Sequence, residues 1–193
     1  MEGLVLKIIY TIFTLINFII RIPHERRNKA NLIVDDQKNV QERVLLLLVF
    51  IGMMIFPLAY VFTNLFGFAN YQVPLLLQVM GILAMATSSW LFYRSHRDLG
   101  RNWSVSLEIR EEHTLVSTGV YSKIRHPMYT AIWLWAIGQA LLLHNYIAGL
   151  GGMLFFGLMY FLRVPEEERM MEDNFGDAYR DYKKQTGRLL PKF

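Results

Sequence analysis

Cysteine is absent from the 193 residues of this sequence. Its absence excludes disulfide bonds, thiol catalysis and metal sites built on cysteine. The five histidines do not show the spacing of metal ligands, so we expect no metal. No glycine-rich loop follows a predicted strand, which argues against a Rossmann-type nucleotide site.

Charge is missing from four long stretches: residues 44–66, 73–93, 128–143 and 146–162 contain no Asp, Glu, Lys or Arg. Transporters and channels usually mark their pathways with ionisable groups inside the membrane, because burying such groups is costly and is kept for function. The absence of charge therefore argues against transport. Any chemistry is expected in the charged segments between these stretches.

Apolar residues make up 53% of the sequence and gather into five runs. These are Leu4–Ile22, Val44–Phe66, Val73–Tyr93, Met128–Leu143 and Tyr146–Leu162. A bilayer core of ~30 Å needs about 20 helical residues, a length that the first three runs reach. We therefore predict an all-α integral membrane protein with five transmembrane helices. It is expected to form one domain over residues 1–193, with three spans in 1–93 and a catalytic region in 94–193.

The last two runs are short, and only His144 and Asn145 separate them. Two helices with so short a link are predicted to form a tight antiparallel hairpin. Small residues on the second arm favour close backbone approach; they are Ala148, Gly149, Gly151, Gly152 and Gly157. The alternative is one long helix, which would place His144 and Asn145 inside the bilayer.

Of the 20 Lys and Arg residues, all except Lys7 lie in segments 21–43, 94–127 and 163–193. Five spans put these segments on one side, and the positive-inside rule makes that side cytoplasmic, with the N-terminus outside. The first run has its basic cluster after its apolar core, so we interpret it as a retained span and not a cleaved signal. The net charge of +4 reflects this topology rather than nucleic-acid binding.

Two polar corners should meet at the open end of the hairpin. Arg125 and His126 precede Pro127, which suits the first position of a helix whose free backbone N–H groups can hold an anion. Arg163 and Glu166–Glu168 follow the fifth run. Both signs of charge are thus expected around one ligand, which favours a zwitterion over a polyphosphate.

The tail is predicted to form an amphipathic helix that begins at Pro165. Met171, Phe175, Tyr179 and Tyr182 recur there at helical spacing, with charges between them. Such a helix would lie against the membrane surface or against the long loop.

Each polar feature also has a structural interpretation. Arginines at span ends are common interfacial anchors, and Tyr121 and Tyr129 can be interfacial aromatics. Glu166–Glu168 suit the first turn of any helix, because the helix dipole favours negative charge there. His126 can be an ordinary cap, and His113 a solvated loop residue. The features indicate a site through their joint order rather than one by one.

That joint order resembles the isoprenylcysteine carboxyl methyltransferase family over roughly Leu99–Pro191. The matching motifs are Leu99-Gly100-x-x-Trp103-Ser104, His113-x-Leu115-Val116, Gly119-x-Tyr121, Arg125-His126-Pro127-x-Tyr129, Arg163 with Glu166-Glu167, Phe175-Gly176, and Tyr179-x-x-Tyr182. The resemblance implies a methyltransferase that uses S-adenosyl-L-methionine and methyl-esterifies the α-carboxylate of a prenylated cysteine.

The resemblance also implies roles for individual residues. Arg163 is expected at the substrate carboxylate, and Arg163 and Glu167 are the expected catalytic residues, with Glu166 and Glu168 as alternatives to Glu167 for the cofactor contact. The cytosolic loop and the C-terminal helix are expected to form the cofactor site. Its implied members are Ser106, His113, Thr114, Leu115, Val116, Tyr121, His126, Pro127, Met128, Tyr129 and Glu167.

Two other functions stay open at this point. The same wider group includes phospholipid and lipid amine N-methyltransferases, and the C-terminal half is distantly similar to NADPH-dependent membrane reductases of the sterol type. Arg163 favours a carboxylate over an amine, since a guanidinium attracts an anion. The expected partners are the lipid bilayer and a lipophilic, prenylated small molecule or peptide, with no nucleic acid.

Overall fold

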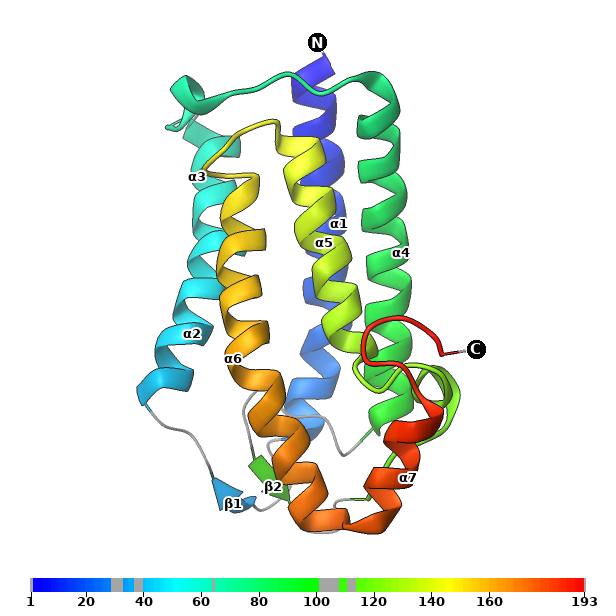
Figure 1. Cartoon of the computed structure of the whole chain (residues 1–193). Helices are drawn as coiled ribbons and strands as arrows, with labels where there is room; N and C mark the ends of the chain where they lie inside the picture. Colours follow the sequence, from blue (N-terminus) through cyan, green and yellow to red (C-terminus); the bar gives the residue numbers. More distant parts are fainter. Residues whose placement is uncertain are drawn as a thin grey trace.

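The structure is a computed structural model that describes residues 2–28, 33–36, 40–63, 65–100, 108–110 and 114–192. Its main helices are α1 (Glu2–Asn28), α2 (Val40–Phe50), α3 (Phe56–Thr63), α4 (Leu75–Leu99), α5 (Pro127–Leu143), α6 (Leu150–Phe175) and α7 (Asp177–Gln185). A π-helical turn, Ile51–Ile55, joins α2 to α3 without a break, and short 3-10 turns lie at Gly67–Ala69 and Gly119–Ser122. Figure 1 shows α1, the α2–α3 column, α4, α5 and α6 running side by side as a bundle.

Three helical segments of the described chain are long and apolar enough to cross a membrane: Gly3–His24, Val40–Thr63 and Leu75–Leu99. Helix α5 is apolar but shorter, with 17 residues. Many large apolar side chains on these helices are exposed, among them Phe62, Leu76 and Leu83. Apolar side chains on an outer surface suit contact with lipid rather than with water.

Helix α5 packs against α1, α4 and α6, and small residues allow the closest approach. Ala131 and Ala136 on α5 are fully buried, and a Cβ atom at Gly138 would lie 2.6 Å from the Met85 side chain of α4. The Ser88 hydroxyl donates to the Ala131 carbonyl across this contact at 2.7 Å. Close packing of small residues holds helices together in lipid, where the hydrophobic effect between helices is absent.

The π-helical turn in the second column has a local cause and a tertiary partner. Pro57 lacks an N–H and crowds the carbonyl four residues earlier, that of Met53. The Tyr10 hydroxyl donates to this carbonyl at 3.2 Å, and the Gln139 amide donates to the Gly52 carbonyl at 2.9 Å. In lipid, a carbonyl freed from the helix needs such a partner. Side chains from α1 and α5 therefore support the distorted turn.

Helices α5 and α6 form the predicted antiparallel hairpin (Figure 1). The predicted turn of two residues is wrong, because residues 144–149 connect the helices and α6 begins at Leu150 instead of Tyr146. Asn145 explains the longer turn: its side-chain oxygen accepts the amides of Ile147 and Ala148 at 3.0 and 2.9 Å. These bonds compete with the start of a helix, as Asn side chains commonly do.

The prediction that a helix begins at Pro165 is also wrong. Helix α6 continues through Pro165 to Phe175, and only α7 forms a separate helix after Gly176, whose φ is +55°. Burial of Arg163 and Val164 keeps the chain helical on the N-terminal side of the proline. The expected amphipathic character is present in α7, where Tyr179 and Tyr182 are buried.

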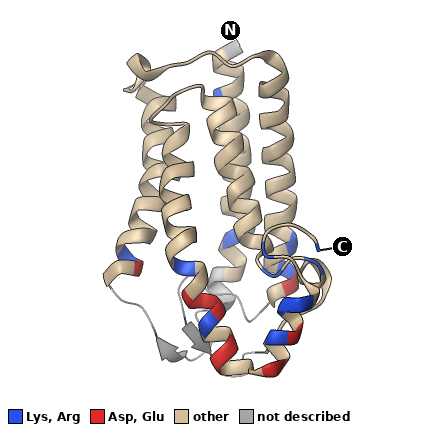
Figure 2. Cartoon of the chain, viewed as in Figure 1, with Lys and Arg blue, Asp and Glu red and all other residues tan. Residues whose placement is uncertain are grey.

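A small two-stranded sheet, which the all-α prediction did not include, accompanies the helices. Strands β1 (Ile33–Asp36) and β2 (Glu108–Arg110) pair antiparallel, with Ile33 opposite Arg110 and Asp36 opposite Glu108. Figure 1 places the sheet beyond one end of the bundle. Figure 2 shows that the described charged residues gather at this same end, apart from a basic position near the N-terminus. The chemistry available to the chain is therefore concentrated at one end.

Candidate functional site

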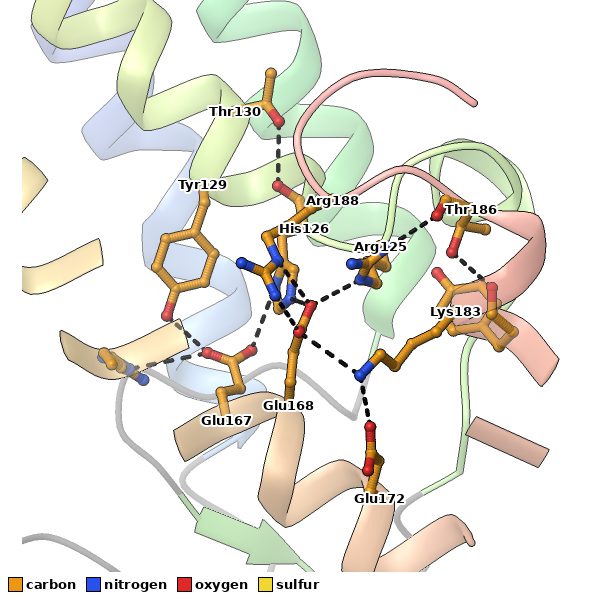
Figure 3. A network of polar contacts seen from close by, with 12 residues as sticks. Arg125, His126, Tyr129, Thr130, Glu167, Glu168, Glu172, Lys183, Thr186 and Arg188 are labelled. Carbon is orange, nitrogen blue, oxygen red and sulfur yellow. Dashed lines mark hydrogen bonds and ion pairs between the residues drawn. The ribbon is translucent and has the colours of Figure 1, made fainter. Parts of the chain in front are cut away.

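The candidate site lies where α5 begins and where α6 extends beyond the bundle. The two predicted polar corners do meet there. The Tyr129 hydroxyl on α5 donates to Oε2 of Glu167 on α6 at 2.6 Å, and His126 Nε2 lies 3.1 Å from Oε1 of Glu168 (Figure 3). Pro127 occupies the first turn of α5, as predicted, and is fully buried.

Glu168 is the centre of a saturated charge network. It accepts hydrogen bonds from Arg125 Nε at 2.7 Å and from Arg188 Nη2 at 2.6 Å, besides the contact with His126 (Figure 3). Burial raises the pKa of Glu168, but the hydrogen bonds from His126, Arg188 and Arg125 outweigh it and hold the pKa far below its usual range. Glu168 is only 4% exposed, so this carboxylate is suited to hold α6, the start of α5 and the tail after α7 together.

Glu167 has a different environment. Its side chain is 27% exposed. Tyr129 is its close partner, whereas His126 Nδ1 lies 3.8 Å from Oε1 and Arg163 Nε lies 3.9 Å from Oε2. A carboxylate with such long contacts keeps the capacity to accept hydrogen bonds from a ligand. Of these two glutamates, the geometry favours Glu167 over Glu168 for ligand contact.

Arg163 lies between two carboxylates. Its Nη1 is 3.6 Å from Oε1 of Glu42 on α2, and its Nε is 3.9 Å from Glu167. The Arg163 side chain is 9% exposed and the Glu42 side chain 5%. Sequence reasoning missed Glu42, although one signal was present: it is the last acidic residue before the charge-free stretch that begins at residue 44.

The tail after α7 returns to the start of α5. The amides of Arg125 and His126 donate to the carbonyls of Gly187 and Arg188 at 2.9 and 3.1 Å. The Thr130 hydroxyl donates to the Leu189 carbonyl at 2.8 Å. The amides of Arg125 and His126, which precede the helix, are therefore occupied, whereas anion binding by the first amides of the helix itself stays a prediction. No sequence pattern distinguishes Arg188 from the other basic residues of the tail, so its role was missed.

The remaining predicted cofactor residues differ in burial, and two of them lie outside the residues that the structure describes. Tyr121 is buried, and its carbonyl accepts the Tyr182 hydroxyl at 2.6 Å. Burial first, and then the negative charge of Glu167, raise the pKa of Tyr121, which indicates that the phenol lies within reach of the field of that carboxylate. Leu115, Val116 and Met128 are half-buried and Thr114 is exposed, whereas Ser106 and His113 lie outside the described residues.

The described side chains fit a ligand of mixed charge. The exposed part of Glu167 can accept from an ammonium group or from ribose hydroxyls, and Arg163 can donate to a carboxylate. Beside Glu167 lies the half-buried ring of Tyr129. Glu167 thus suits the ammonium and ribose groups of S-adenosyl-L-methionine, and Arg163 suits the carboxylate of a second ligand.

Comparison with known proteins gives a consistent match. The model of the isoprenylcysteine carboxyl methyltransferase family matches residues 77–173, which is half of the chain. A protein-S-isoprenylcysteine O-methyltransferase from Homo sapiens is 34% identical over 117 residues, covering 60% of this chain and 41% of that protein. One from Schizosaccharomyces pombe is 32% identical over 87 residues, covering 45% and 37%. The chain thus spans less than half the length of these relatives.

A solved structure of a eukaryotic intramembrane Ras methyltransferase of this name shares the fold. Its TM-score is 0.54 at 24% identity, and the match covers 82% of this chain and 54% of that one. Together with the apolar helices, this likeness identifies a multi-pass integral membrane protein. The family match spans α4 to α6 and includes His126, Tyr129, Arg163 and Glu167. This chain belongs to the isoprenylcysteine carboxyl methyltransferase family.

Proposed function

We propose that this chain uses S-adenosyl-L-methionine to methyl-esterify the α-carboxylate of a prenylated cysteine. The observation that supports this most is Arg163, a buried guanidinium at the membrane end of the polar site. Arginine binds a carboxylate through two parallel hydrogen bonds, whereas a lipid amine offers it no acceptor of comparable strength. The named relatives are O-methyltransferases of isoprenylcysteine, which agrees with this choice.

The cofactor residues follow from the site and from the family. Glu167, Tyr129 and His126 line the described part, and Tyr121 lies nearby. The family resemblance adds Ser106, His113, Thr114, Leu115, Val116, Pro127 and Met128. When bound, S-adenosyl-L-methionine supplies a methyl group on a positively charged sulfur, which a carboxylate oxygen can displace to give an ester and a neutral thioether.

The protein needs no general base for this reaction. An α-carboxyl group has a pKa of about 3.3–3.7 and is ionised at neutral pH. Arg163 is therefore proposed to orient the carboxylate, and alignment of this kind can contribute up to ~7–11 kcal/mol. Glu168 and the side chains bonded to it keep α6 in register with α5, so Arg163 and Glu167 hold their positions. Burial excludes water from two charges that are lost in the product.

We expect the membrane to contribute to recognition of the acceptor by taking up its prenyl tail. We propose five spans in a single domain, with the catalytic region in residues 94–193, the site on the cytoplasmic face and the N-terminus outside. The distribution of Lys and Arg supports this orientation. A prenyl tail contributes ~0.8 kcal/mol per buried methylene-sized unit on entering lipid, which explains the membrane location of such an enzyme.

In the decisive experiment, the purified full chain is incubated with labelled S-adenosyl-L-methionine and a panel of acceptors. The panel contains N-acetyl-S-farnesylcysteine, free fatty acids and phosphatidylethanolamine. Label should enter farnesylcysteine as a base-labile ester. Label in phosphatidylethanolamine instead would assign a lipid amine N-methyltransferase. Binding of NADPH in place of S-adenosylhomocysteine would indicate a reductase and would contradict the proposal.

A further inference from the structure

Asp98 is a largely buried carboxylate that the proposed reaction does not use. It lies in the last turn of α4, and its side chain is 9% exposed. The dipole of a helix disfavours negative charge in this turn. Two arginines of α4 partly balance the charge: Arg97 Nε lies 3.1 Å from Oδ1, and Arg94 Nη2 lies 3.5 Å from Oδ2. A carboxylate at this unfavourable position indicates a role outside α4.

Outside α4, Asp98 contacts the 3-10 turn that carries Tyr121. The Val120 amide donates to Oδ2 of Asp98 at 3.0 Å, across 22 positions of the chain. Gly119, directly before it, has a φ of +62°, and a Cβ atom there would overlap Oδ2 of Asp98. A side chain at position 119 would therefore displace the carboxylate from the Val120 amide. Glycine at 119 and aspartate at 98 are thus a matched pair.

The same turn is also held from α7. The Tyr182 hydroxyl donates to the Tyr121 carbonyl at 2.6 Å. The Val120 side chain packs against a buried apolar cluster formed by α4 and α5. The backbone around Tyr121 is therefore fixed between α4 and α7, and Asp98 is a polar anchor on the α4 side.

The place of Tyr121 matters because its buried phenol lies within the field of Glu167, the glutamate that is suited to contact a ligand. Small misplacements of a group at a site have large effects on binding and reaction. We propose that Asp98 is a positioning residue for the cofactor: its bond to the Val120 amide keeps Tyr121 at the site. Asp98 acts through Tyr121. This inference rests on the proposed function for the presence of S-adenosyl-L-methionine beside Tyr121.

The first test measures the affinity of the purified full chain for S-adenosylhomocysteine, which needs neither acceptor nor turnover. Asp98→Ala should bind it about tenfold more weakly than wild type, because a charge-assisted hydrogen bond that fixes the turn is lost. Asp98→Asn keeps an oxygen that can accept from the Val120 amide, so it should retain most of the affinity.

The matched control is Arg97→Gln, which removes an ion pair of Asp98 and leaves the Val120 bond in place. Its affinity for S-adenosylhomocysteine should equal that of wild type. An affinity that is unchanged in Asp98→Ala, or that falls equally in Asp98→Asn or Arg97→Gln, would overturn the inference.

The second test separates the positioning of Tyr121 from a general loss of structure. Tyr121→Leu should itself weaken binding of S-adenosylhomocysteine. In that background Asp98→Ala should cause no further loss, because the phenol that Asp98 positions is gone. Additive losses would mean that Asp98 acts by another route and would contradict the inference. If Asp98→Ala does not fold, Gly119→Ala, which leaves every charge in place, should show the same loss and the same coupling to Tyr121→Leu.

Failure of this inference and failure of the proposed function give different results. If wild type binds S-adenosylhomocysteine but transfers no methyl group to farnesylcysteine, the proposed acceptor is wrong, and the Asp98 variants still decide the inference. If wild type methylates farnesylcysteine and Asp98→Ala binds S-adenosylhomocysteine as wild type does, the inference alone fails. If wild type binds no S-adenosylhomocysteine, both fail.

Discussion

Polar groups are buried at both ends of the α5–α6 hairpin, but they are paired by different kinds of side chain at each end. At the turn, neutral groups meet: the Asn145 amide donates to the Phe66 carbonyl at 2.6 Å and to Asn70 at 2.8 Å, and Tyr60 donates to Asn70 at 2.8 Å. At the open end, charged groups meet around Glu168 and Glu167 (Figure 3). Neutral amides cost less to bury than charges.

A second contrast lies within the open end itself. Glu168 is saturated by close cationic partners, whereas Glu167 and Arg163 are held by contacts of 3.6 to 3.9 Å together with one tyrosine. Adjacent positions on one helix thus differ in function. The buried carboxylate supports the architecture, and the partly exposed one remains available to a ligand.

The largest expected effect is on stability, from Glu168→Ala. Removing this carboxylate takes away the ion-pair partner of Arg125 and Arg188, and breaking a buried ion pair costs ~3–5 kcal/mol. Thermal unfolding in detergent should show the loss. Glu167→Ala, the matched variant one position earlier, should cost only about 1 kcal/mol, because its ionic contacts are longer and its side chain is more exposed. Equal losses would remove the distinction between the two glutamates.

Next in size is the effect of Arg163→Lys on activity. Lysine keeps the charge but cannot form the paired hydrogen bonds of a guanidinium. Misplacement of the acceptor should lower kcat/KM for N-acetyl-S-farnesylcysteine about 100-fold. Equilibrium dialysis should show unchanged affinity for S-adenosylhomocysteine. A parallel loss of cofactor affinity would assign Arg163 to the cofactor instead of the acceptor.

At the neutral end, Asn145→Ala should destabilise the fold by about 1–3 kcal/mol, since buried hydrogen-bonding groups lose their partner. The activity of the folded fraction should be unchanged, because the turn lies at the opposite end of the hairpin from Arg163. Thermal unfolding and methyl transfer by the same preparation separate the two effects. A reduced kcat at full folding would show that the two ends are coupled.

The smallest effect concerns pH. The folded-state pKa of Glu168 lies below the ordinary value, so its stabilising contribution is complete above an ordinary glutamate pKa of about 4.3. The contribution is lost as the pH falls from there through the folded-state pKa. Wild type should therefore lose stability more steeply on acidification than Glu168→Gln, in unfolding curves recorded from pH 6 to pH 3. Parallel curves would contradict the low pKa.

The sequence by itself determined the helical membrane architecture, the hairpin and the meeting of His126 and Tyr129 with Glu167. Charge-free runs and their lengths carry that information, because each run must form its own helix in lipid. Only the tertiary structure decided that Glu42 faces Arg163, that Arg188 returns to Glu168 and that α6 continues through Pro165. Sequence periodicity describes the faces of single helices, whereas these contacts depend on how distant segments pack.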